Sequence, residues 1–349
     1  MLEQPLIFDL GKRPPTTRAL ALQIRQRGDA ALDQAQRRAD AARYQEVSCR
    51  SALNAVKGMP FNWTLNPYRG CTHGCHYCFA RRYQTQFELG PDDHFSSVIF
   101  VKINLLDVLR RELDKPSWRR EQVAVGTATD PYQPIEGHYK LTRGSLEALL
   151  AGRTPIGLVT KGPMVVRDAD LLAELGRRYG ATVYMSVPTV DEEAWRALEP
   201  GTAPPLQRLR AVRQLRDAGI NAGVLMAPVV PAFTTQTSKL EATIKAIADH
   251  GAAFMGANVM YLKEGTKDHF MGFLAKQFPQ LVESYNRLYA GAYAHKDYVT
   301  AVRGMIDVLQ QRYDVRRRRD RNEESVPHRR EEADEEAPPA CEQTAFEWE

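Results

Sequence analysis

The stretch Asn66-Pro-Tyr-Arg-Gly-Cys-Thr-His-Gly-Cys-His-Tyr-Cys-Phe-Ala-Arg81 holds three of the five cysteines in this chain. Cys71, Cys75 and Cys78 are separated by three and then by two residues. Thiolates this close in sequence can converge on one soft metal centre. The stretch therefore predicts a metal-binding loop, and the rest of the chain is interpreted around it.

Two other uses of clustered cysteines compete with an iron–sulfur cluster. A zinc site needs a fourth ligand, which His73 or His76 could supply. Zinc motifs, however, usually bring two separated ligand pairs, and the sequence contains no second Cys/His pair. A disulfide is disfavoured because three is an odd number and nothing in the sequence indicates secretion. The pattern favours the iron–sulfur cluster and leaves zinc as the alternative.

Length and composition are those of a globular protein. The chain has 349 residues, of which 43% are hydrophobic and 26% are charged. The first residues, Met1-Leu-Glu-Gln-Pro, do not have the pattern of a signal peptide, and no apolar stretch approaches membrane-spanning length. Few cysteines, grouped for metal ligation, are typical of a reducing compartment. We therefore expect a cytoplasmic protein that does not associate with a membrane.

The charge of the chain is unevenly distributed. The formal net charge is +4, but residues 314–349 contain seven Arg and twelve Asp or Glu, which leaves +9 on residues 1–313. A basic body is compatible with a polyanionic partner such as nucleic acid. It is also common in proteins that bind none, so charge alone does not decide the partner.

From Phe61 onward, short β-like runs alternate with amphipathic helical segments. The predicted strands are 61–65, 98–102, 122–126, 156–160, 182–187, 222–226 and 254–261. The predicted helices are 104–113, 143–150, 169–179, 205–218 and 238–250. Such alternation predicts an α/β fold with parallel strands joined by helical crossovers. An open doubly wound sheet and a full or partial barrel both fit this pattern.

The two ends of the chain differ from its centre. Residues Thr17 to Arg43 predict a helix rich in arginine, and a helical segment is expected between Tyr261 and about Gln311. Residues 314–349 have too little apolar surface to fold alone. We therefore divide the chain into an extension (1–53), a core (54–262), a helical segment (263–313) and a charged disordered tail (314–349). The aromatic residues of the helical segment are expected to pack against the core rather than to stack on bases: Phe270, Phe273, Phe278, Tyr285, Tyr289 and Tyr293.

Polar residues stand at the ends of three consecutive predicted strands. Thr129 and Asp130 follow the strand at 122–126, Lys161 follows the strand at 156–160, and Ser186 ends the strand at 182–187. Polar groups at the carboxyl ends of barrel strands usually face the ligand. Each residue alone has an ordinary explanation as a turn or a solvent-facing group, but together they predict a binding site.

These motifs together resemble the spore photoproduct lyase-related branch of the radical S-adenosylmethionine (radical SAM) superfamily, often labelled DNA repair photolyase-like. The likeness extends from about Asn54 to Tyr261 and includes Leu198-Glu-Pro-Gly and Arg208-Leu. It implies a partial (β/α)6 barrel of the TIM type. It also implies that the three cysteines hold three irons of a [4Fe-4S] cluster, whose fourth iron binds SAM. Thr129, Lys161 and Ser186 match positions that contact SAM, and Asp130 lies beside them.

The resemblance implies an enzyme that reductively cleaves SAM to a 5′-deoxyadenosyl radical, supplied with electrons by a reductant such as flavodoxin or ferredoxin. The expected substrate is a nucleic acid or nucleotide. Modification of a small molecule or protein is the alternative, and a non-catalytic iron–sulfur or zinc protein is a second one. Thr127 stands where the lyase has a hydrogen-donating cysteine. An alcohol O–H bond is too strong for that role, so we do not expect the lyase reaction in its known form.

Overall fold

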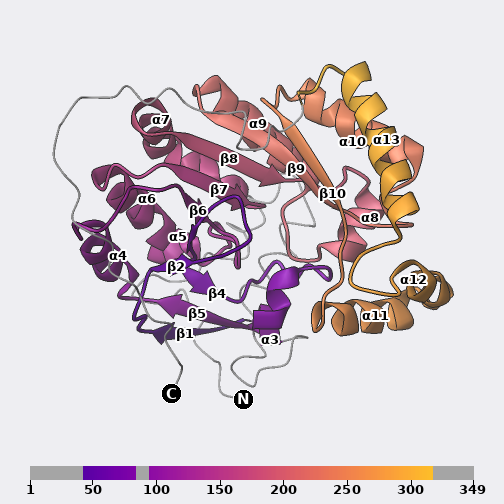
Figure 1. Ribbon diagram of the computed structural model, residues 1–349, viewed down its shortest axis with the longest axis horizontal. Helices are drawn as coiled ribbons and strands as arrows, with labels where there is room; N and C mark the ends of the chain where they lie inside the picture. The colour runs from indigo at the N-terminus through magenta and orange to yellow at the C-terminus, as the bar shows by residue number, and fades with distance from the viewer. Residues whose placement is uncertain (1–41, 84–93, 317–349) are drawn as a thin grey trace, which may run out of the picture. The chain divides into compact units, whose positions relative to one another are not determined.

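The computed structural model describes residues 42–83 and 94–316 (Figure 1). Most of the helix predicted for Thr17 to Arg43 lies outside these residues, and Arg43 itself begins a strand instead. The charged tail lies outside them from residue 317 onward. The division of the chain into extension, core, helical segment and tail stays a prediction.

A seven-stranded sheet forms the centre of the described region. Its strand order is β10-β9-β8-β7-β6-β3-β2. The first six strands in this order are parallel to one another, and β2 pairs antiparallel with β3. The strands are β2 (Leu53–Ala55), β3 (Trp63–Leu65), β6 (Val123–Val125), β7 (Ile156–Thr160), β8 (Ala181–Ser186), β9 (Asn221–Val229) and β10 (Met255–Val259). Six parallel strands thus follow one another in chain order. The expected α/β fold, a partial (β/α)6 barrel, is confirmed.

Helices follow the outer side of this sheet in an arc (Figure 1). They are α4 (Leu105–Leu113), α6 (Leu141–Ala151), α7 (Ala169–Arg178), α9 (Pro205–Asp217) and α10 (Thr237–Asp249). The predicted bounds agree with these to within two residues at either end. Short helices α5 (Glu136–Tyr139) and α8 (Glu192–Leu198) and the 3-10 turns η1 (Phe79–Tyr83) and η3 (Pro163–Asp168) lie in the connections.

The core lies between the sheet and these helices. Leu158, Val183 and Val224 on neighbouring strands are fully buried, as are Leu172 and Ile244 on the helices. Central parallel strands are covered on both faces, so they consist of apolar runs rather than alternating residues. This rigid centre leaves the strand ends and their loops to provide the site.

The predicted strand β5 (Val98–Lys102) forms, but outside the main sheet. It is the middle strand of a small sheet, parallel to β1 (Arg43–Val47) and antiparallel to β4 (Tyr68–Arg69). Its inclusion among the parallel barrel strands was therefore wrong, because local sequence gives strand propensity but not the pairing partner. Strand β4 directly precedes Gly70, so this small sheet fixes the backbone that enters the cysteine loop. Helix α3 (His94–Ser97) leads into β5.

The helical segment after β10 consists of α11 (Thr266–Gln277), α12 (Val282–Leu288), α13 (Lys296–Arg312) and the turn η4 (Pro279–Leu281). Phe270, Phe273, Tyr285 and Tyr289 are buried, and Phe278 is partly buried against the core, as predicted. Tyr293 was predicted wrongly, because 65% of its surface is exposed. Within the described residues, no helix has the length and apolar character needed to cross a bilayer.

Candidate active site

The cysteine loop curls tightly between β4 and η1. Gly70 and Gly74 both have positive φ, of 80° and 61°. A Cβ at Gly70 would lie 2.6 Å from the Val98 carbonyl oxygen and 3.0 Å from that of Phe95, so only glycine fits there. The backbone N–H of Cys78 donates to the Cys75 carbonyl at 3.3 Å, which closes the second turn of the loop.

The three thiols lie on one short loop, near enough to influence one another electrostatically. Cys71 and Cys75 are buried and Cys78 is half-buried. Burial raises the pKa of the Cys71 thiol well above its ordinary value, and Asp130 and the other two thiols raise it further. Burial also raises the pKa of Cys75 to about 12, against the attraction of Lys161. Metal ligation would remove these protons, because thiolates are the ligating form.

The donor set fits a cluster held by three cysteines. His73 Nδ1 lies 3.4 Å from Asp130 Oδ2, and His76 Nδ1 lies 3.2 Å from His269 Nε2. Both histidines that could complete a zinc site are therefore engaged elsewhere. Among residues 42–83 and 94–316, no three His, Cys, Asp or Glu side chains are placed as a group that could hold a metal ion. Three thiolates without a fourth protein ligand leave one iron of a four-iron cluster open to another ligand.

Two segments brace the loop from outside. The buried Arg81 guanidinium donates to the carbonyl oxygens of Gly74 at 2.8 Å and Cys75 at 3.0 Å. The end of α8 and the residues that follow it also contact the loop. The Leu198 carbonyl accepts from the N–H of His76, and the Gly201 N–H donates to the His73 carbonyl, both at 3.0 Å. The loop is thus fixed by backbone contacts that do not depend on its thiols.

At the end of β6, Asp130 connects the loop to β7. Its carboxylate accepts from Thr160 Oγ1 at 2.7 Å, from the Lys161 N–H at 2.6 Å and from the Tyr132 N–H at 2.9 Å. Burial alone would raise the pKa of this carboxyl, but His73 and these hydrogen bonds outweigh it and lower the pKa to about 2. Asp130 is therefore a charged anchor inside the protein.

Thr129 also faces the loop. Its hydroxyl donates to the Gly70 carbonyl at 2.6 Å, and Gln133 Nε2 donates to Thr129 Oγ1 at 3.0 Å. Gln133 Oε1 in turn accepts from the Thr72 N–H at 3.2 Å. Thr127 is close by, with its hydroxyl 3.5 Å from Asn66 Nδ2.

At the ends of β7 and β8, Lys161 and Ser186 meet. Lys161 Nζ donates to Ser186 Oγ at 2.7 Å, and Ser186 Oγ donates to the Ala227 carbonyl at 3.2 Å. Burial alone would lower the pKa of Lys161, but Glu199 and the nearby thiols of Cys75 and Cys78 outweigh it and raise the pKa. A charged ammonium beside a hydroxyl is an arrangement that binds a carboxylate.

Sequence reasoning did not identify Glu199 and Arg208 as members of the site. Glu199 is buried and lies 3.6 Å from Lys161 Nζ, 2.5 Å from Arg208 Nη2 and in hydrogen-bond contact with the Tyr77 hydroxyl. Arg208 is fully buried and donates to the Ser186 carbonyl at 2.9 Å. Both residues lie in the segments Leu198-Glu-Pro-Gly and Arg208-Leu, which belong to the family resemblance, but nothing in their local sequence indicates a role in the site.

The chain is similar to known proteins in sequence and in fold. Residues 65–247 match the model of the Radical SAM superfamily. An uncharacterized protein of Mycobacterium tuberculosis is 40% identical over 278 residues, which cover 78% of this chain and 82% of that protein. A radical SAM Nalpha-GlyT isomerase of Pseudomonas phage M6 is 28% identical over 176 residues, which cover 48% of this chain and 33% of the isomerase.

Among solved structures, spore photoproduct lyase with bound AdoMet and dinucleoside spore photoproduct superposes with a TM-score of 0.61 at 15% identity. The match covers 82% of this chain and 83% of the lyase chain. The lyase complexed with the dinucleoside spore photoproduct alone gives a TM-score of 0.62 at 14% identity and the same coverage. At this level of identity, the likeness shows a common fold.

Proposed function

The chain belongs to the Radical SAM superfamily and is a radical SAM enzyme, and we propose that it acts on a nucleic-acid or nucleotide substrate. Membership implies a [4Fe-4S] cluster and SAM as cofactors. When bound, they supply the electron and the SAM cleavage that generate a 5′-deoxyadenosyl radical able to take a hydrogen atom from a substrate. What this chain contributes is binding, orientation and exclusion of water around that chemistry.

Cys71, Cys75 and Cys78 are the proposed cluster ligands. Two observations support this assignment. Cys75 and Cys78 are near enough to Cys71 to raise the pKa of its thiol, and Gly70 and Gly74 have the positive φ of a tightly curled loop. Arg81 holds the loop carbonyls, which orients the cysteine backbone without contacting the metal. Flavodoxin or ferredoxin is the proposed reductant, and the proposed compartment is the cytoplasm.

Lys161 and Ser186 are the proposed contacts for the SAM carboxylate. The single observation that carries the proposed SAM-binding function is the hydrogen bond of 2.7 Å from Lys161 Nζ to Ser186 Oγ. Lys161 is also near enough to Cys75 to act on the pKa of its thiol. Glu199 keeps Lys161 protonated, and Arg208 keeps Glu199 ionised. Thr129 and Asp130 are also proposed members of this site. Thr129 can still accept a hydrogen bond, and Asp130 orients the Lys161 backbone.

The substrate class rests on two supports. Residues 1–313 carry a charge of +9, and the lyase that shares this fold has been captured with a dinucleoside substrate. Thr127 replaces the donor thiol of that lyase, so we propose a different reaction or a different final hydrogen donor. Modification of a small molecule or protein remains the second candidate within the same enzyme class.

Anaerobic reconstitution with iron and sulfide, followed by mass analysis of SAM products, tests this function. The reduced protein is expected to form 5′-deoxyadenosine. Lys161→Ala is expected to weaken SAM binding by about 10- to 150-fold, since a hydrogen bond to a charged group contributes about 1.5–3 kcal/mol. Lys239→Ala removes a lysine that pairs with Asp191 on another part of the protein, and it serves as the control. Equal SAM affinity in the two variants would show that Lys161 does not bind the SAM carboxylate.

A further inference from the structure

A small aromatic and cationic surface lies at the edge of the cysteine loop. Tyr261 and Tyr293 are joined by an antiparallel bridge, and their ring centres are 5.9 Å apart. The Leu262 N–H donates to the Ala292 carbonyl at 2.7 Å, which holds the two backbones together. Lys263 Nζ lies 6.0 Å from the centre of the Tyr261 ring. We call Tyr261, Lys263, Tyr293, Arg82 and Tyr83 the tyrosine platform.

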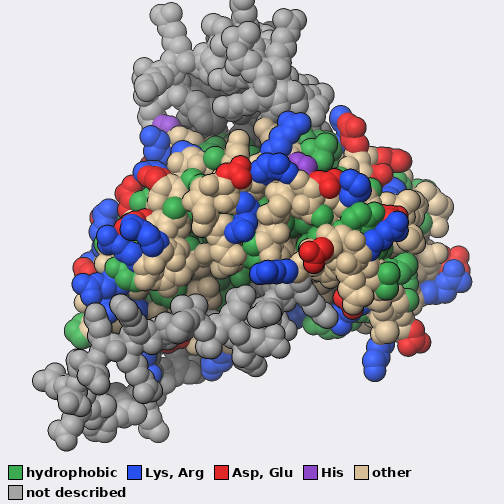
Figure 2. Space-filling model, turned by 90° about the horizontal axis from the view of Figure 1, so that it is seen from above, with side chains coloured by type: hydrophobic (Ala, Val, Ile, Leu, Met, Phe, Trp, Pro, Cys, Tyr) green, Lys and Arg blue, Asp and Glu red, His purple; other side chains and the backbone are tan. Residues whose placement is uncertain are grey.

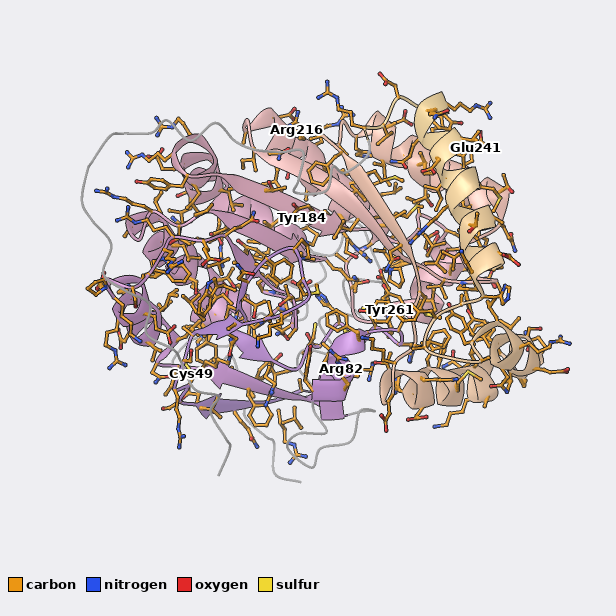
Figure 3. The ribbon with its side chains drawn as sticks, viewed as in Figure 1. Cys49, Arg82, Tyr184, Arg216, Glu241 and Tyr261 are labelled. Carbon is orange, nitrogen blue, oxygen red and sulfur yellow. The ribbon has the colours of Figure 1, made fainter. Side chains whose placement is uncertain are left out.

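The platform reaches the cysteine loop. Arg82 Cζ lies 4.9 Å from the centre of the Tyr83 ring, and Arg82 and Tyr261 lie close together in Figure 3. Thr266 Oγ1, four residues beyond Leu262, donates to the Cys78 carbonyl at 3.4 Å. Burial raises the pKa of Tyr261, and among the groups that act on it are Arg82, which lowers it, and Cys78, which raises it. The surface therefore begins beside a proposed cluster ligand.

Exposure distinguishes the platform from the core aromatics. Tyr261 is half-buried, whereas Tyr293 has 65% of its surface exposed, although Tyr285 and Tyr289, which precede it in the chain, are buried. An exposed tyrosine ring backed by a second ring offers one free π face. Lys263 is also exposed, and both Lys263 and Arg82 bring positive charge near Tyr261.

Net charge alone does not locate a binding surface on this protein. The face in Figure 2 shows Lys and Arg side chains interspersed with Asp and Glu. Surfaces that bind single-stranded nucleic acid combine aromatic rings, on which bases stack, with cations that follow the phosphates. The tyrosine platform has this combination, and it lies next to the proposed radical site.

We propose that the tyrosine platform binds an unpaired nucleotide of a single-stranded or locally opened nucleic acid, with a base stacked on Tyr293 and the adjoining phosphates near Lys263 and Arg82. The proposal rests on the proposed function, whose substrate class it makes specific. A base held on Tyr293 directs its strand along Tyr261 toward Cys78.

The test measures binding by the full chain with its cluster reconstituted. The probes are a fluorescein-labelled single strand of about 12 nucleotides, the same strand with abasic sites, and the matching duplex. Tyr293→Leu is expected to weaken binding of the single strand by about 5- to 150-fold, the effect of one lost base stack. The abasic strand is expected to bind the unaltered protein about as weakly. Lys263→Ala is expected to lower the salt slope of binding by about 1.

Two control variants match these changes elsewhere. Tyr179→Leu removes a partly buried tyrosine at the end of α7, and Lys245→Ala removes an exposed lysine on α10 that pairs with Asp249. Both are expected to leave the affinity for the single strand unchanged. A loss of affinity in the controls equal to that in the platform variants would overturn the proposal.

Other outcomes decide against it in different ways. Equal affinity for the abasic strand and the base-containing strand would reduce the platform to a phosphate contact and overturn base stacking. If Tyr293→Leu leaves strand binding unchanged but slows SAM cleavage driven by reduced flavodoxin and not by dithionite, the platform is a docking surface for the reductant. Strand binding through Tyr293 by a protein that never cleaves SAM would instead refute the proposed function and leave the platform standing.

Discussion

The polar ends of neighbouring strands in the main sheet behave differently. At the end of β6, Asp130 and Thr129 direct their hydrogen bonds to the backbone and side chains of the protein itself. At the ends of β7 and β8, Lys161 Nζ donates to Ser186 Oγ, and the positive charge of Lys161 is balanced by Glu199 at 3.6 Å. The end of β6 therefore mainly holds the cysteine loop and the Lys161 backbone in place, while the ends of β7 and β8 present an ammonium and a hydroxyl suited to a ligand.

The comparison depends on the cluster, and removal of a thiol has the largest expected effect. Anaerobically purified protein is expected to contain about four iron atoms per chain, and Cys71→Ala, Cys75→Ala or Cys78→Ala is expected to lose them. Cys49→Ala removes a half-buried cysteine outside the loop and is the matched control. Iron and sulfide analysis reads out the result. Zinc in place of iron, or full iron content in the loop variants, would show that the three cysteines do not hold an iron–sulfur cluster.

The second largest effect is expected at the ligand-facing end. Glu199→Gln leaves the fully buried Arg208 without its carboxylate, and an unpaired buried charge costs about 3–5 kcal/mol. Urea unfolding measures this loss of stability. Glu283→Gln, at an exposed pair with Arg287, is expected to change nothing. Comparable stability of the two variants would show that Glu199 does not stabilise the buried charge of Arg208.

Asp130→Asn tests the anchoring end through pH. Because the folded-state pKa is about 2, below the ordinary 3.8, the charge of Asp130 contributes stability above pH 4 that is lost as pH falls toward 2. The shift corresponds to about 2 kcal/mol. The variant is therefore expected to unfold more easily than the parent at pH 7, and the difference is expected to vanish near pH 2. A difference that stays constant with pH would contradict a charged anchor.

The smallest effect is expected at Ser186. Ser186→Ala removes one hydroxyl from Lys161, and the SAM affinity is expected to fall about 2- to 10-fold. Ser145→Ala removes a buried hydroxyl in α6 that donates to the Leu141 carbonyl at 2.6 Å, and it is the control. Isothermal titration under anaerobic conditions measures both. A loss of SAM affinity in the control as large as that in Ser186→Ala would show that Ser186 does not contact SAM.

The sequence predicted elements well where the signal is local. Helix α9 begins at the Pro204-Pro205 pair and ends before Gly219, so its bounds could be predicted from capping residues. Strand β5 was predicted as a strand but placed in the wrong sheet, because pairing with β1 and β4 is a long-range property. The same limit applied to the site. The proximity of Lys161 and Ser186 could be predicted from their strand ends, whereas the contacts of Glu199 with Tyr77 and Arg208 form only when α8 and α9 come together.

Gly201 has a consequence for the way sequences of this kind can vary. A Cβ there would lie 2.9 Å from the His73 carbonyl oxygen and closer still to that of Thr72, although Gly201 is far from the cysteines in sequence. Any larger residue would displace the backbone between Cys71 and Cys75. In a saturation library selected for iron content, position 201 is thus expected to tolerate as few substitutions as the ligands themselves. A descendant that had lost its thiols would be released from that restriction, so alanine at 201 would mark a lineage that no longer assembles the centre.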